Sequence, residues 1–247
     1  SDSSLAASLL NNLDARTSGA INANSINTLT GKNDELLLAF AAQQSNRDRN
    51  QELESSSSGS IVGLNNPAVT ITDTVTVEQA NAMAALTTGA VTATISEGDL
   101  ASLIELNETG NAYTITINDA SVDAAILNKI RTKTTAKINA NAVNTITGTL
   151  LEISTIYNSS QFTGLGNEAI SITSTTIRAA DLNAIDAATN NVINAAGITT
   201  LVGSVDDLNQ AYGSTGIAGL GNEAVILEDK TIDPIKLNRL NGKTSGD

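Results

Sequence analysis

The hexapeptide GLGNEA occurs twice, at residues 164–169 and 219–224, and fits the G-x-G-x-x-A pattern of dinucleotide-binding loops. A phosphate-binding loop of that kind follows a strand and opens a helix, so that the pyrophosphate meets the helix N-terminus. Here each copy follows a helix-like segment and leads into a strand-like one, AISIT or AVILE. This reversed order predicts a structural corner, in which Gly164 and Gly166 adopt positive φ.

Carboxylates are the other groups that could do chemistry. The pairs Asp34/Glu35 and Asp206/Asp207 could act as acid and base, but they fall in expected first helical turns, where negative charge is favoured in any case. Acidic and amide oxygens are also the ligands that calcium prefers, although neither an EF-hand loop nor a G-G-x-G-x-D repeat is present. The candidate metal ligands are the polar residues of the two corners, Asn167, Glu168, Asn222 and Glu223.

The composition narrows the classes of function further. The chain has 26 acidic and 13 basic residues, and it contains no Cys, His or Trp. Thiolate and imidazole chemistry are therefore excluded, and the net charge of −13 disfavours nucleic acid and anionic membrane surfaces as partners. No apolar run approaches the roughly 20 residues that span a bilayer. We therefore expect no enzyme, no cofactor and no membrane insertion, with divalent cations, calcium in particular, as the most natural ligands.

Internal repeats predict the architecture. Strand-like segments with two apolar residues two apart, such as Ile170 and Ile172, are followed by helix-like segments with apolar residues three apart, such as Leu182 and Ile185. Segments that begin INA start at Ile138 and again at residue 193, and this interval equals that between the two GLGNEA segments. We predict an α/β solenoid with one short parallel strand and one or two helices per turn, in turns of about 23 and 32 residues.

The boundaries follow from the phase of the repeat. We predict one array over residues 1–247, with partial turns at residues 1–19 and 224–247. Residues 45–60, which include the serines of 55–58, interrupt the pattern and predict an insertion that is either a mobile loop or a helix extension. Because both partial turns break the repeat in its middle, we expect neighbouring repeats or other copies of the chain to stack end to end.

An asparagine follows the first apolar residue of each predicted helix. Recurrence at one place predicts a column of side-chain hydrogen bonds between neighbouring turns, with Asn183 facing the adjacent turn. The members of this column are Asn11, Asn81, Asn128, Asn183, Asn209 and Asn238.

The segment LNAIDAATNNVINAAGITTLVGSVDDLNQAYGSTGIAGLGNEA resembles the repeat unit of very large surface or secreted proteins of marine bacteria, cyanobacteria in particular. Similar arrays occur in structural proteins of their phages. The resemblance covers most of residues 1–31 and 68–247, and it implies a secreted, acidic, Cys-free scaffold without a catalytic motif.

These observations together lead to the expected function. We expect a non-catalytic structural or adhesive repeat segment of an extracellular, cell-surface protein or filament. The alternatives left open are a calcium- or glycan-binding module and a phage fibre or appendage component.

Overall fold

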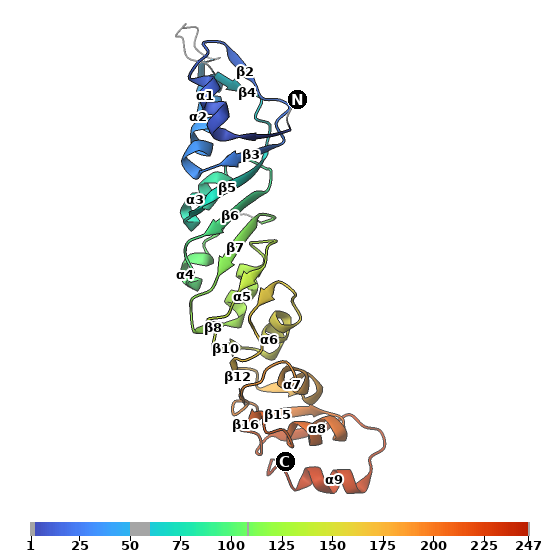
Figure 1. The fold of residues 1–247 in the computed structure, drawn as a ribbon. Helices are drawn as coiled ribbons and strands as arrows, with labels where there is room; N and C mark the ends of the chain where they lie inside the picture. The colour runs from blue at the N-terminus through green and yellow to red at the C-terminus, as the bar shows by residue number, and fades with distance from the viewer. Residues whose placement is uncertain (1–2, 50–59, 108, 247) are drawn as a thin grey trace. The chain divides into compact units, whose positions relative to one another are not determined.

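The structure is a computed structural model, and it describes residues 3–49, 60–107 and 109–246. The chain divides into two compact units, one of residues 1–116 with 132–137 and one of residues 117–131 with 138–247. Each unit is an α/β arrangement in which parallel strands form sheets and helices lie between them in sequence (Figure 1).

Unit 1 contains a parallel sheet with the strand order β1-β3-β5-β6-β7 and a separate pair, β2 and β4. Its helices lie together on one side of these strands (Figure 1). The elements are β1 (Ser4–Ala6), α1 (Ala7–Asp14), β2 (Ala20–Asn22), β3 (Thr28–Gly31), α2 (Asn33–Arg49), β4 (Ser60–Val62), β5 (Ala68–Val75), α3 (Val77–Ala84), β6 (Val91–Ile95), α4 (Leu100–Leu103) and β7 (Ala112–Thr116).

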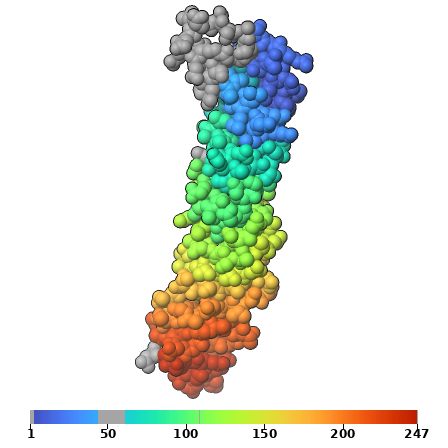
Figure 2. Space-filling view, turned by 90° about the vertical axis from the view of Figure 1, so that its left-hand side faces the viewer, coloured from blue at the N-terminus to red at the C-terminus, as the bar shows by residue number. Residues whose placement is uncertain are grey.

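Unit 2 contains two parallel sheets, with the orders β16-β14-β12-β10-β8 and β13-β15-β17, and the pair β9 and β11. Within each unit, successive segments form successive bands of colour in a space-filling view (Figure 2). The elements are β8 (Ser121–Asp123), α5 (Ala124–Arg131), β9 (Ile138–Asn139), β10 (Thr145–Gly148), α6 (Leu150–Tyr157), β11 (Phe162–Thr163), β12 (Ala169–Ile172), β13 (Thr176–Arg178), α7 (Ala179–Asp186), β14 (Ile193–Asn194), β15 (Thr200–Gly203), α8 (Val205–Ala211), β16 (Ile217–Ala218), β17 (Ala224–Leu227) and α9 (Pro234–Asn241).

The strand register gives the length of one turn. In unit 2 the same step separates the paired residues Ser121–Thr145, Thr145–Ala169, Thr176–Thr200 and Thr200–Ala224, and the step between β12 and β14 is one residue shorter. Two such steps, together with the short advance from Ala169 to Thr176, make up the full period that separates Ser121 from Thr176. The strands β11 and β16, before the two corners, were not expected from the sequence, and they pair with the INA strands β9 and β14.

The insertion is visible in the same register. Thr28 pairs with Ala68, whereas Thr145 pairs with Ala169, so the step at Thr28 is longer by the length of segment 45–60. Helix α2 continues to Arg49, so residues 45–49 extend a helix. The rest of the insertion, residues 50–59, lies outside the described residues, and so does the mobility expected there.

The apolar pattern builds the core as predicted. Leu182 is 0% exposed, and Ile170, Ile172 and Ile185 are 1%, 5% and 3% exposed. Polar caps fix several helix starts: Thr149 and Glu152 form a reciprocal capping box at α6, which satisfies main-chain N–H groups that have no partner within the helix. These caps and core positions place the polar side chains described next.

Candidate functional site

The two GLGNEA segments are corners that lead into β12 and β17, as the reversed order predicted. Gly164 and Gly166 have φ of +87° and +125°, a region that only glycine enters readily. A Cβ atom on Gly164 would lie 1.9 Å from Oδ1 of Asn141, so this corner also needs a glycine for space. Its glycines therefore serve the turn itself, and the corner leads into a strand rather than into a helix.

The glutamate of each corner is buried and bonded to protein groups. Glu168 is 1% exposed, and its carboxylate oxygens accept the main-chain N–H of Gly166 at 2.8 and 3.1 Å. The hydroxyl of Tyr157 donates to Oε2 of Glu168 at 2.7 Å. The carboxylate thus ties helix α6 to the corner that follows it.

The same arrangement recurs one full period later. Glu223 is 2% exposed, accepts the N–H of Gly221 at 2.8 and 3.1 Å, and accepts the hydroxyl of Tyr212 at 2.9 Å. Burial raises the pKa of Tyr212 to about 12, and burial together with the Glu168 carboxylate raises the pKa of Tyr157 above its usual range. Both phenols therefore keep the proton that they donate at neutral pH.

The four candidate metal ligands differ in exposure. Asn167 and Asn222 are exposed, whereas Glu168 and Glu223 are buried. Oδ1 of Asn222 accepts the hydroxyl of Ser245 at 3.1 Å. Within the described parts of the chain there is no cluster of three or more Asp or Glu residues that could hold a metal ion.

The asparagine column forms the most regular polar feature. Each Nδ2 donates to a main-chain oxygen of the next turn, which is side chain to main chain rather than side chain to side chain. The bonds run from Asn11 to Glu35 (2.8 Å), from Asn81 to Glu105 (2.8 Å), from Asn128 to Glu152 (2.9 Å), from Asn183 to Asp207 (2.9 Å) and from Asn209 to Lys236 (3.1 Å). The last predicted member, Asn238, is exposed.

A second column consists of hydroxyl groups just after the helices. Each threonine donates to a main-chain oxygen 20 or 21 residues earlier, in or just before a strand, whereas each asparagine bonds a residue later in the chain. These bonds run from Thr87 to Pro67 (2.7 Å), from Thr134 to Tyr113 (2.7 Å), from Thr189 to Glu168 (2.8 Å) and from Thr244 to Glu223 (3.0 Å).

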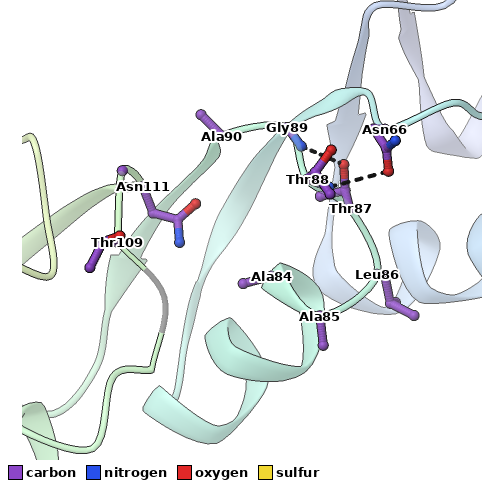
Figure 3. A pocket seen from close by; sticks show the side chains of 11 residues that line it. Asn66, Ala84, Ala85, Leu86, Thr87, Thr88, Gly89, Ala90, Thr109 and Asn111 are labelled. Atoms are coloured by element: carbon purple, nitrogen blue, oxygen red, sulfur yellow. Dashed lines mark hydrogen bonds between the residues drawn. The ribbon is translucent and has the colours of Figure 1, made fainter.

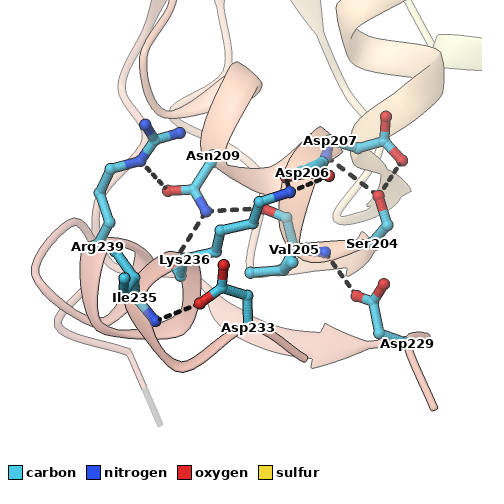
Figure 4. Close-up of polar contacts among 10 residues, drawn as sticks. All are labelled: Ser204, Val205, Asp206, Asp207, Asn209, Asp229, Asp233, Ile235, Lys236 and Arg239. Atoms are coloured by element: carbon cyan, nitrogen blue, oxygen red, sulfur yellow. Dashed lines mark hydrogen bonds and ion pairs between the residues drawn. The ribbon is translucent and has the colours of Figure 1, made fainter. Parts of the chain in front are cut away.

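The acidic pairs lie in first helical turns, as predicted. Around α8 and α9 the carboxylates bind local groups: Asp206 pairs with Lys236 at 2.7 Å, and Asp207 accepts the hydroxyl of Ser204 at 2.6 Å (Figure 4). Asp229, from the next turn, accepts the first N–H of α8, that of Val205, at 2.6 Å (Figure 4). Such caps from the next turn were not predicted from the sequence.

A hollow of about 530 Å³ in unit 1 lies between the ends of two turns (Figure 3). Its polar side chains hold the protein together: Asn66 accepts the N–H of Thr88, Thr87 that of Gly89, and Asn111 that of Val91. Among the lining residues that the structure describes, none is charged. The described side chains that line the hollow are thus uncharged, and these polar groups bond to neighbouring main-chain groups.

The tyrosines were the functional residues that sequence reasoning missed. Tyr157 precedes Glu168 by 11 residues, and Tyr212 precedes Glu223 by the same distance, so the repeat itself carried the signal.

No protein-family model, no curated protein and no solved structure matched this chain. Over the residues that the structure describes, none of the helices has the length and apolar character needed to cross a bilayer.

Proposed function

We propose that this chain is a non-catalytic structural segment of an extracellular surface protein or filament, in which residues 1–247 form one solenoid array. The observation that carries the proposal is the recurrence of the Asn and Thr bonds at nearly constant sequence steps. These Asn and Thr side chains fasten one turn to the next, so each turn contacts mainly its neighbours, as in repeat proteins.

The proposed extracellular setting rests on the composition of the chain and on the resemblance of its repeat unit to those of known surface proteins. A Cys-free chain with a net charge of −13 resists oxidation and aggregation, which suits a large secreted scaffold. The repeat unit resembles those of giant surface proteins of marine bacteria, and a phage appendage would use the same structural role in a virion. In either setting the partners are neighbouring repeats or further copies, stacked end to end.

A calcium- or glycan-binding module is the alternative that an experiment must distinguish from the structural role. Thermal melting with Ca²⁺, Mg²⁺ and chelator at matched ionic strength does so for calcium, because a ligand at 100 times its Kd adds about 2.7 kcal/mol to the stability of the folded state. The structural role predicts equal melting temperatures in Ca²⁺ and Mg²⁺. A rise that is specific to Ca²⁺, and that the Asn167→Ala/Asn222→Ala variant abolishes, would favour the binding module instead.

A further inference from the structure

Three helices of equal length end differently. Helices α3, α5 and α7 each have 8 residues, and their last residues are Ala84, Arg131 and Asp186. In unit 2 a side chain from the following turn bonds to this last residue: Ser214 donates to Oδ2 of Asp186 at 2.7 Å, and Gln161 donates to the main-chain oxygen of Arg131 at 3.2 Å. In unit 1 no side chain of the described residues bonds to Ala84. The end of α3 therefore lacks the bridging side chain that the other two helix ends have.

The hollow of about 530 Å³ lies at this helix end. It is lined by Ala84 and Ala85 on one side and by Thr109, Gly110 and Asn111 on the other (Figure 3). Helix α4, in the following turn, has 4 residues where α3 and α5 have 8, so this turn has less chain with which to fill the space. A Cβ atom built on Gly110 would have no atom within 4 Å, as expected for a segment that borders open space.

Asn111 presents an unused donor to the hollow. The residue is 5% exposed, and its Oδ1 accepts the N–H of Val91 at 2.8 Å. Its Nδ2 has no acceptor among the described residues, yet it is not one of the unpaired atoms that are sealed from solvent. Figure 3 shows this side chain extending toward the end of α3. A fixed amide N–H group is thus available to a molecule in the hollow.

The other groups around the hollow are neutral donors and acceptors. The main-chain oxygens of Ala84 and Ala85, at the end of α3, accept no hydrogen bond among the described residues. The hydroxyls of Thr88 and Thr109 can each donate or accept. An anionic ligand would meet the negative end of the α3 dipole and the net charge of −13. The set of groups therefore matches a neutral molecule that is rich in hydroxyl groups.

We propose that this hollow binds a neutral hexose unit. One sugar hydroxyl accepts the Nδ2 hydrogen of Asn111, and others donate to the main-chain oxygens of Ala84 and Ala85. The volume of about 530 Å³ is within the range of small-molecule sites. Because no aromatic side chain is present among the described lining residues, binding depends on hydrogen bonds and has a Kd of about 1 mM. The site belongs to one turn and adds to the structural role proposed above.

The test is a ¹H–¹⁵N NMR titration of the full chain with glucose, galactose and mannose, each also as its methyl glycoside. The main-chain signals of Gly89 and Gly110 and the side-chain amide signal of Asn111 should shift saturably with at least one hexose. Glucuronate, which carries a carboxylate, should bind at least about tenfold more weakly. A methyl glycoside that binds as well as the free sugar indicates units of a polysaccharide, and a preference for the free sugar indicates monosaccharides; both results support the site.

Two variants test the site in different ways. Asn111→Asp keeps an oxygen that can accept the N–H of Val91 but removes Nδ2, so it should weaken hexose binding at least about tenfold. Ala84→Gln places a longer side chain in the hollow, at the position that Arg131 occupies on α5, and should abolish the shifts. Ala180→Gln is the matched control: it makes the same change at an exposed position of α7 and should bind as the unmodified chain does.

Three results would overturn the proposal: no hexose shifts these signals at about 10 mM, ten times the expected Kd, glucuronate binds as well as the hexoses, or the shifts persist in both variants. Circular dichroism establishes that each variant is folded. Asn111→Asp and Ala84→Gln act by different means, so either one alone decides the question if the other unfolds. A negative titration would remove the sugar site alone, because the calcium melts above test the structural role separately.

Discussion

Asn183 donates from Nδ2 to the main-chain oxygen of Asp207 at 2.9 Å, joining helix α7 to helix α8. Asn183 is 7% exposed, so its side chain is buried in the packing between the two helices. Asn183→Ala should therefore lower the free energy of unfolding by about 1–3 kcal/mol. Urea titration measures this, with the exposed Gln210→Ala as a control that should change stability by no more than about 0.5 kcal/mol. Equal losses in the two variants would show that the column contributes nothing specific.

The side-chain oxygen of Asn183 suggests a substitution that should stabilise the folded chain. Oδ1 of Asn183 is buried without a hydrogen-bond partner among the described residues, whereas Oδ1 of Asn209, one helix later, accepts Nε of Arg239 at 2.9 Å. Gln210 occupies the place on α8 that Arg239 occupies on α9, the sixth residue of the helix. Gln210→Arg should add about 0.5–1.5 kcal/mol. The gain should vanish in an Asn183→Ala background, and a gain that persists there would come from elsewhere.

We predict that the stability of the folded chain falls at alkaline pH, where the partly buried tyrosine hydroxyls lose their protons. Burial raises the pKa of Tyr212 from 10.0 to about 12, so the folded chain holds this proton more tightly than the unfolded chain does. The contribution is complete below pH 10 and is lost as the pH rises through about 12. Tyr212→Phe should flatten the fall of the urea midpoint between these values. A midpoint with the same pH dependence in the variant would contradict the assignment.

Two glycines with positive φ, Gly110 and Gly164, allow the conformational cost of an alanine substitution to be separated from its steric cost. Gly110 has φ of +85° with no atom within 4 Å of a built Cβ, so Gly110→Ala tests the backbone alone and should cost about 1–2 kcal/mol. Gly164 has a similar φ of +87°, but its Cβ would meet Asn141 at 1.9 Å. Gly164→Ala should therefore cost clearly more than Gly110→Ala in thermal melts. Equal costs would mean that Asn141 moves away freely.

The α/β class, the full period of the repeat and the core were predictable because each depends on local patterns that the chain repeats. The spacing of Ile170 and Ile172 gave a strand, that of Leu182 and Ile185 gave a helix, and recurrence gave the asparagine column. The corner was predictable as well, because the order of helix, GLGNEA and strand excludes a phosphate loop.

The short strands before the two corners and the tyrosine–glutamate contacts were not predicted, because they depend on contacts between segments that are separate in the sequence. Strands such as β11 and β16 are only two residues long, so they have too little pattern to be recognised without their partners. Glu168 was a candidate metal ligand because its carboxylate supplies the oxygen atoms that calcium prefers. Its burial requires the Tyr157 hydroxyl, which lies one element away.

The array itself can be tested by removing one period. Deleting residues 169–223 joins Glu168 to Ala224, which restores the natural GLGNEA sequence at the junction. Because the deletion removes about one fifth of the chain and each turn contacts its neighbours, the shortened chain should fold cooperatively, with a urea m-value of about four fifths of the original. Deleting residues 169–212 breaks the phase and should lose folded structure. An in-phase deletion that is unfolded by circular dichroism, or that behaves like the out-of-phase deletion, would contradict the account of this chain as a structural repeat array.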